Sequence, residues 1–211
     1  MALDDTQIEK EIQIDKMENL WNENKRIIVV VVVLIIAIYI GLQFYQYSAK
    51  KSGEMASQLY QEIITLSIDN VEMIKSGVTQ LKESHSDTPY SSRGAIYLSR
   101  SLVNKKMYDE AVAELIWASD NANEKSIQSL ALYSLSNVYL VLKNIDEAMI
   151  AANKISTPGY LGLKNDLLGD IYMASNDNEK ARINYEAALN FYQNKSELAK
   201  VIQTKIDAIS Q

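Results

Sequence analysis

The chain has 211 residues, with 21 basic and 27 acidic side chains, a net charge of −6 and no cysteine. The absence of any basic stripe argues against nucleic acid as a partner, and the absence of cysteine excludes disulfides and thiolate metal sites. Seven glycines and two prolines are few for a turn-rich sheet, so we expect an all-α protein.

Residues 1–26 form an acidic leader with seven acidic and four basic side chains. Five apolar residues of this segment recur at helical spacing, namely Ile8, Ile12, Met17, Leu20 and Trp21. They could form one face of an amphipathic helix, which would either contact another protein or lie along a membrane surface.

Residues 27–47 predict a transmembrane helix. No charge occurs between Ile27 and Leu42, and extension to Tyr47 gives a helix of about 31 Å, which matches a bilayer. The five consecutive valines would also suit a buried strand, but a lone strand of this length would be unusual. A cleaved signal peptide fits poorly, because the leader is long and acidic and bulky aromatic residues stand where a small-residue cleavage site belongs.

The flanking charges predict the orientation of this helix. Four basic residues precede it, whereas the near flank on the other side has only Lys50 and Lys51. The positive-inside rule therefore predicts that residues 1–26 form a cytoplasmic tail and that residues 48–211 lie on the opposite side of the membrane.

A repeated pattern follows the transmembrane segment. Three acidic helix starts recur, at Asp109-Glu110-Ala111, Asp146-Glu147-Ala148 and Glu179-Lys180-Ala181, with the alanines 37 and 33 residues apart. This spacing approximates the 34-residue period of tetratricopeptide repeats, which are pairs of antiparallel helices. We therefore expect a tetratricopeptide-like α-solenoid, clearest over about residues 92–195 and closed by a capping helix at 196–209. Two further helical stretches are expected within residues 53–84, and loops are expected at 84–92, 119–125 and 156–159.

Close helix packing explains the small residues of the pattern. In the third copy we expect Gly169 to let the first helix approach the second, whose Ala181 supplies the matching small surface. Tyr172 and Tyr185 are expected to fill the wider gaps between layers. A generic bundle would also show small and large residues at helical spacing, but three copies in register favour a repeat.

The sequence shows no catalytic arrangement. His85 is the only histidine, and its polar neighbours suggest a solvated loop position. No phosphate-binding glycine loop, dinucleotide fingerprint or zinc-protease motif occurs. The acidic pairs recur at helix starts, where a structural role explains them. We therefore expect no enzyme activity, no catalytic residue, no metal, no cofactor and no small-molecule substrate.

The remaining function class is protein binding. Stacked helix pairs present a concave face built from the first helix of each pair. Its candidate binding residues are Arg93, Ile96, Arg100, Tyr133, Asn137, Leu140, Asp170 and Met173. This mixture could hold extended peptide segments of varied sequence, although some of these side chains could equally pack between neighbouring repeats.

The whole arrangement resembles the YfgM family, the ancillary subunits of the bacterial SecYEG translocon. The resemblance rests on Glu18-x-Leu20-Trp21-x-Glu23-Asn24-x-Arg26, Ala56-x-x-Leu59-Tyr60, Leu167-Leu168-Gly169-Asp170, Ala181-x-x-x-Tyr185-Glu186-Ala187 and Lys205-Ile206-Asp207-x-Ile209. It implies a single-pass inner-membrane protein with a periplasmic repeat domain. Its partners would be the SecYEG translocon, a PpiD-type membrane-anchored chaperone and newly exported client proteins.

Two other hypotheses remain open from the sequence. The chain could be a scaffold for assembly of another cell-envelope complex, in which case it would hold one folded partner rather than many unfolded segments. Alternatively, an enzyme or regulator could act through the leader. Removal of residues 2–20 would separate this last hypothesis from the others.

Overall fold

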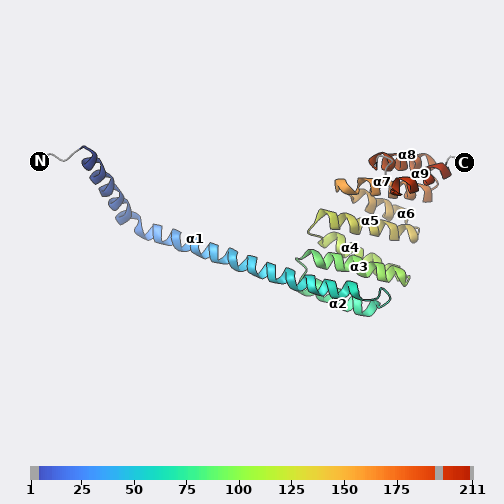
Figure 1. The fold of residues 1–211 in the computed structure, drawn as a ribbon, viewed down its shortest axis with the longest axis horizontal. Helices are drawn as coiled ribbons and strands as arrows, with labels where there is room; N and C mark the ends of the chain where they lie inside the picture. Colours follow the sequence, from blue (N-terminus) through green and yellow to red (C-terminus); the bar gives the residue numbers. More distant parts are fainter. Residues whose placement is uncertain (1–4, 193–196, 210–211) are drawn as a thin grey trace. The chain divides into compact units, whose positions relative to one another are not determined.

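The computed structural model describes residues 5–192 and 197–209, and every regular element within these ranges is a helix. The chain divides into two compact units, Met1–Lys51 and Ser52–Gln211. Figure 1 shows the helices in chain order. The expected all-α fold class is confirmed.

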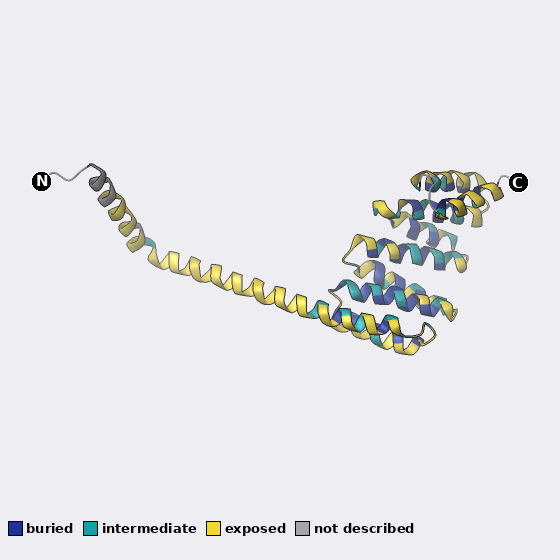
Figure 2. Ribbon diagram, viewed as in Figure 1, coloured by how far each residue is buried: buried dark blue, intermediate teal, exposed yellow. Residues whose placement is uncertain are grey.

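Helix α1 spans Asp5–Thr65 and contains the apolar stretch. Within it, Trp21–Thr65 includes a window long and apolar enough to cross a membrane, with none of that window buried inside the protein. Figure 2 shows the exposure of this part of α1. Of the expected amphipathic face in the leader, Ile12, Met17 and Trp21 are exposed, whereas the side chains of Ile8 and Leu20 lie outside the described residues. A long helix whose aliphatic side chains find no protein partner is suited to lipid.

The second unit is a stack of helix pairs that starts with the end of α1. The remaining elements are α2 (Val71–Ser84), α3 (Pro89–Asn104), α4 (Tyr108–Asn121), α5 (Lys125–Val141), α6 (Ile145–Lys154), η1 (Pro158–Tyr160), α7 (Leu161–Ala174), α8 (Asn178–Phe191) and α9 (Glu197–Ile209). Each helix from α2 to α8 packs against the next, and α3, α5 and α7 also contact one another in series. This is the solenoid arrangement that the sequence period predicts, and Figure 1 shows its successive layers.

The same turn closes each of the three pairs. Lys106, Lys143 and Asn176 have φ values of 61°, 60° and 61°, in the left-handed region. The residue after each of them donates its N–H to the carbonyl five positions earlier, at 2.9 Å in every case. This is the Schellman motif, which satisfies carbonyl groups at a helix end. The turn therefore repeats at the spacing of the alanines.

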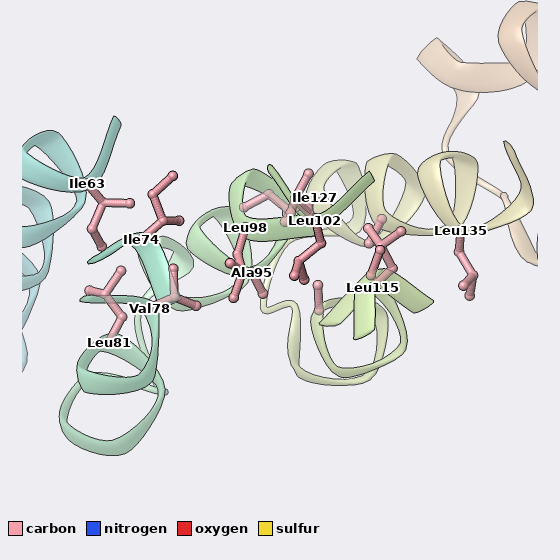
Figure 3. Packing of buried hydrophobic residues seen from close by; sticks show 14 of the residues in the cluster. Ile63, Ile74, Val78, Leu81, Ala95, Leu98, Leu102, Leu115, Ile127 and Leu135 are labelled. Atoms are coloured by element: carbon pink, nitrogen blue, oxygen red, sulfur yellow. The ribbon is translucent and has the colours of Figure 1, made fainter. Parts of the chain in front are cut away.

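A continuous apolar core links the first layers. It runs from Ile63 at the end of α1 and Ile74 on α2, through Leu98 and Leu115, to Leu135 on α5, as Figure 3 shows. Leu98, Leu115 and Ile74 are at most 1% exposed. Separate buried clusters join α5, α6 and α7, and then α8 and α9. Because each cluster is shared by consecutive helices, stability depends on neighbour contacts along the stack.

The partner of Gly169 differs from the expected one. A Cβ built on Gly169 would lie 2.3 Å from Cε1 of Tyr185 on α8, so the aromatic ring of Tyr185 occupies the space that the glycine leaves. Ala181 is fully buried, but it is the tyrosine ring that requires the glycine. In the preceding repeat Ser136 holds the equivalent position, and its hydroxyl donates to the carbonyl of Ala148 on α6 at 2.8 Å.

The expected loop at 84–92 is shorter in the structure, because α3 already begins at Pro89. Proline fixes φ near the helical value and has no N–H to leave unpaired, which suits the first helical turn. The expectation of a solvated His85 is also wrong. His85 is buried, with Nδ1 2.9 Å from Oγ of Ser52 on α1. The loop histidine therefore ties residues 85–88 to α1.

Candidate functional site

The first helices of the pairs, α3, α5 and α7, carry all eight candidate residues of the expected concave face. The structure groups them into three sets. Arg93, Ile96 and Arg100 lie on α3, and Tyr133, Asn137 and Leu140 lie on α5. Asp170 and Met173 lie on α7. These sets have different surroundings, and the first lines a hollow among the described residues.

That hollow, here called the inner groove, has a volume of about 340 Å³. Its lining residues are Tyr60, Arg93, Ile96, Tyr97, Arg100, Ser126, Ile127, Leu130 and Tyr160. They come from the end of α1, from α3 and α5, and from η1. The groove therefore lies within the second unit and is shared by consecutive layers of the solenoid.

Arg93 and Arg100 supply the positive charge of the groove. They are seven residues apart on α3, which is two helical turns, so both project on one face. Arg93 Nη2 lies 3.4 Å from Oε2 of Glu124, and its guanidinium carbon lies 5.8 Å from the centre of the Tyr90 ring. Arg100 is exposed and makes no ion pair within the described part of the chain. Among the described residues, the groove thus holds one weakly paired cation, Arg93, and one cation without an ion-pair partner, Arg100.

The tyrosines of the groove have different roles. The Tyr97 hydroxyl donates to the carbonyls of Ile64 and Leu66 at 3.4 and 3.3 Å, which holds the end of α1 against α3. Burial raises the pKa of Tyr60, while the charges of Arg93 and Arg100 oppose that rise. Both guanidinium groups are therefore close enough to act electrostatically on the Tyr60 hydroxyl.

Sequence reasoning missed six lining residues. Tyr97 lies one turn after Arg93 on the same helix face, and Leu130 lies one turn before Tyr133, so helical spacing could have found them. Ser126 and Ile127 also belong to α5. Tyr60 and Tyr160 come from α1 and η1, and no local pattern connects them with α3.

The second set has internal partners on α5. The amide of Asn137 donates to the carbonyl of Tyr133 at 2.8 Å. Leu140 packs on the buried cluster that joins α5, α6 and α7. Burial raises the pKa of the half-buried Tyr133, and the nearby carboxylates of Asp166 and Asp170 add to this rise.

The third set is dominated by Lys205 of the capping helix. Its Nζ lies 2.8 Å from Oδ1 of Asp166 and 2.7 Å from Oδ1 of Asp170. The Tyr185 hydroxyl donates to the same oxygen of Asp170 at 2.7 Å. Asp170 is therefore held by α8 and α9, whereas Met173 is 36% exposed.

Burial, hydrogen bonds and neighbouring charges shift the pKa values of the residues in this network. Burial raises the pKa of Asp166, and the ammonium of Lys205 opposes the rise. Burial alone would lower the pKa of Lys205, but its hydrogen bonds to the two carboxylates outweigh that cost and raise the pKa. Burial and donation to Asp170 raise the pKa of Tyr185. The network fastens α9 to α7, with one ammonium shared by two carboxylates.

Among the described residues, no group of three or more histidine or acidic side chains could hold a metal ion. His85 is engaged with Ser52 in the packing of α1 against the following loop. The inner groove presents cations, tyrosines and aliphatic side chains, which suit recognition of a peptide.

The fold is similar to that of solved repeat proteins. Crystal structures of kinesin light chain TPR-like repeats from Podosopora anserina superpose with TM-scores of 0.56 and 0.54 at 16% and 15% identity. Each match covers 76% of this chain and 84% of the solved one. At this identity the likeness concerns the fold alone.

Curated relatives match over most of their length. Proteins named ancillary SecYEG translocon subunit from Haemophilus influenzae, Neisseria gonorrhoeae and Escherichia coli K12 are 24%, 22% and 22% identical. The matches cover 86%, 96% and 94% of this chain and 89%, 98% and 95% of the relatives. The family model described as tetratricopeptide repeat-like domain matches residues 18–211, and the chain belongs to this family.

Proposed function

We propose that this protein is a single-pass membrane protein of the Sec translocon that binds other proteins through its repeat domain and performs no chemistry. The observation that carries the proposal is the agreement between near-full-length relatives named ancillary SecYEG translocon subunit and an open groove suited to peptides. The exposed apolar segment of α1 supports membrane anchoring.

The proposed topology follows from charge. Four basic residues precede the apolar stretch and two follow it closely, so residues 1–26 would be cytoplasmic, 27–47 would span the inner membrane and 48–211 would be periplasmic. Because the chain has no cysteine, one introduced cysteine reports its own side of the membrane. Asn176→Cys should react with a membrane-impermeant maleimide in intact cells from which the outer membrane has been made permeable. Gln13→Cys should react only after the inner membrane is broken, and the opposite result would reverse the topology.

In this topology the inner groove faces the compartment into which exported chains emerge. The protein would receive extended segments of newly exported proteins and pass them to a PpiD-type membrane-anchored chaperone. Groove contacts of modest strength suit exchange, because exposed ion pairs contribute little each. The partner contact would be more lasting.

Crosslinking in native membranes tests this proposal. A photo-reactive amino acid at Leu130, which lines the groove, should capture exported precursors during secretion. The control position is Ile183 on α8, which is 55% exposed and should capture far fewer precursors. Chemical crosslinking of the intact protein should also recover translocon subunits and the chaperone. Recovery of one unrelated envelope assembly, with neither of these partners, would favour the scaffold function instead.

A further inference from the structure

The inner groove has a charge opposite to that of the protein around it. The chain carries a net charge of −6, yet the residues that line the groove include two arginines and no acidic side chain. Glu124 lies at the edge of the groove, where its carboxylate is 3.4 Å from Arg93 and accepts a long hydrogen bond from the Ser126 hydroxyl at 3.5 Å. A locally cationic hollow in an acidic protein favours ligands that bring negative charge.

The two arginines are available to a ligand. Arg100 is exposed and has no ion-pair partner within the described residues. The pair between Arg93 and Glu124 is long, and the two side chains are 41% and 45% exposed, so water screens it. A carboxylate from a ligand could replace Glu124 at small cost. A guanidinium can bind such a carboxylate through two parallel hydrogen bonds.

The other residues that line the groove favour a ligand with an apolar side chain next to that carboxylate. Ile96 and Ile127 are buried at the base of the groove, whereas Leu130 is 38% exposed and can be covered by a ligand. The hydroxyls of Tyr60 and Tyr160 make no hydrogen bond to any described residue. They can therefore bind the backbone of an extended peptide.

The spacing of the arginines sets the spacing of the ligand's charges. Two turns of α3 separate Arg93 from Arg100 by about 10.5 Å along the helix axis. A peptide in polyproline II conformation returns to the same face every three residues, after about 9.3 Å. In a β-strand, same-face residues are about 6.8 Å or 13.6 Å apart. Of these two extended conformations, polyproline II matches the arginine spacing on α3 better.

We propose that the inner groove binds an extended peptide with two acidic side chains three positions apart and a leucine-like residue between them, and that Arg93 and Arg100 each take one carboxylate. This inference deepens the proposed function and rests on it, since it states which segments of an exported protein the groove would select. Acidic-apolar segments would be captured in preference to basic ones.

The test uses the full-length protein in phosphatidylcholine nanodiscs. The probe is a fluorescein-labelled ten-residue peptide with two glutamates three positions apart and leucine between them, and anisotropy measures binding. A matched peptide has glutamine at both positions, and another has the two glutamates adjacent. We expect the first peptide to bind about tenfold more tightly than the glutamine peptide at low salt. We also expect it to bind more tightly than the peptide with adjacent glutamates.

Variants assign the effect to the arginines. Arg93→Glu and Arg100→Glu should each weaken binding about fivefold or more, whereas Arg182→Glu on α8 should have no effect. Arg182 is a fair control because its side chain is 54% exposed and its pair with Glu186 is 3.9 Å long. Glu124→Gln should strengthen binding about twofold, because it removes the carboxylate that competes for Arg93. A gain of affinity cannot arise from loss of folding.

Other outcomes would overturn the inference. These are equal affinity for the glutamate and glutamine peptides, no binding of either peptide, or wild-type affinity in Arg100→Glu. Loss of peptide binding when phosphatidylglycerol replaces phosphatidylcholine would show that the arginines take lipid headgroups instead, which also overturns it. Failure of this selectivity alongside intact crosslinks to the translocon would refute only the inference. Selective peptide binding without those crosslinks would refute only the proposed function.

Discussion

The ring of Tyr185 on α8 lies directly against the bare backbone of Gly169 on α7. A Cβ at position 169 would be 2.3 Å from Cε1 and 2.4 Å from Cδ1 of that ring. Tyr185 is 2% exposed, and its hydroxyl donates to Asp170, so the ring has no direction in which to move freely. The close packing of α7 against α8 therefore requires a residue without a Cβ at position 169.

Gly169→Ala should destabilise the repeat domain by about 1–3 kcal/mol, because the added methyl overpacks the contact with Tyr185. Gly169→Leu should lower the stability of the domain by at least as much, because its side chain is larger. Thermal unfolding of the fragment 48–211, followed by circular dichroism, measures this change.

Gly53→Ala is the matched control, since a Cβ at position 53 meets no atom within 4 Å. Alanine favours the helix there, so we expect Gly53→Ala to raise stability by about 0.5–1 kcal/mol. An unchanged melting temperature in Gly169→Ala would contradict the packing described for α7 and α8.

Lys205→Met should destabilise the domain by about 1–3 kcal/mol at neutral pH, because it leaves Asp166 and Asp170 close together and partly buried without their cation. Lys200→Met on the same helix should change stability by less than about 0.5 kcal/mol, since its pair with Glu197 is 75% and 88% exposed. Chemical denaturation of both variants gives the comparison.

The effect of Lys205→Met should shrink in acid. Burial already raises the pKa of Asp166 above its ordinary value of 3.8 in the wild type, and loss of Lys205 removes the charge that opposes this rise. The folded variant therefore binds a proton at higher pH than the unfolded chain does, so its stability falls as pH increases from about 3.8 through the raised pKa. A destabilisation that grew as pH fell would contradict the network.

Lys143→Gly should stabilise the domain by about 0.5–1 kcal/mol. Lys143 has φ of 60° in the turn between α5 and α6, where a side chain is strained and glycine is not. Asn176→Gly should gain less, because asparagine tolerates this conformation better. Equal or negative effects in both variants would show that the backbone cost is offset elsewhere. Differential scanning calorimetry can resolve changes of this size.

Two buried serines should respond differently to replacement by alanine. The Ser136 hydroxyl donates to the carbonyl of Ala148 at 2.8 Å, so Ser136→Ala should cost about 1 kcal/mol. The Ser92 hydroxyl is buried without a hydrogen-bond partner among the described residues, so Ser92→Ala should be neutral or slightly stabilising. Urea unfolding measures the free energy of unfolding of both variants. An equal loss of stability in the two would contradict the hydrogen bonding described here.

The repeated helix starts and the apolar helix of this protein could be predicted from its sequence. The three acidic helix starts lie in the first turns of α4, α6 and α8. The uncharged stretch from Ile27 to Leu42 lies within one exposed helix. Such features depend on neighbours three or four residues away, and the same turn recurs wherever the same local pattern recurs.

The candidate binding surface could be predicted only in part from the sequence. Helical spacing along α3 gave Arg93, Ile96 and Arg100, and these three residues line the inner groove. The same spacing on α7 predicted Asp170 as a binding residue. In the structure, however, the ammonium of Lys205 on α9 forms an ion pair with the Asp170 carboxylate. Whether a polar side chain stays available depends on residues far away in sequence, which a local period does not contain.

The sequence by itself determined that this chain is an apolar helix followed by a helical repeat, because hydrophobic period and helix-end chemistry are local properties. Only the tertiary structure decided that His85 is buried against Ser52, that Tyr185 fills the space beside Gly169, and that Tyr60 and Tyr160 complete the groove. Each of these contacts joins separate elements. Their partners are set by how the layers stack, since close packing leaves room for only one arrangement of large side chains.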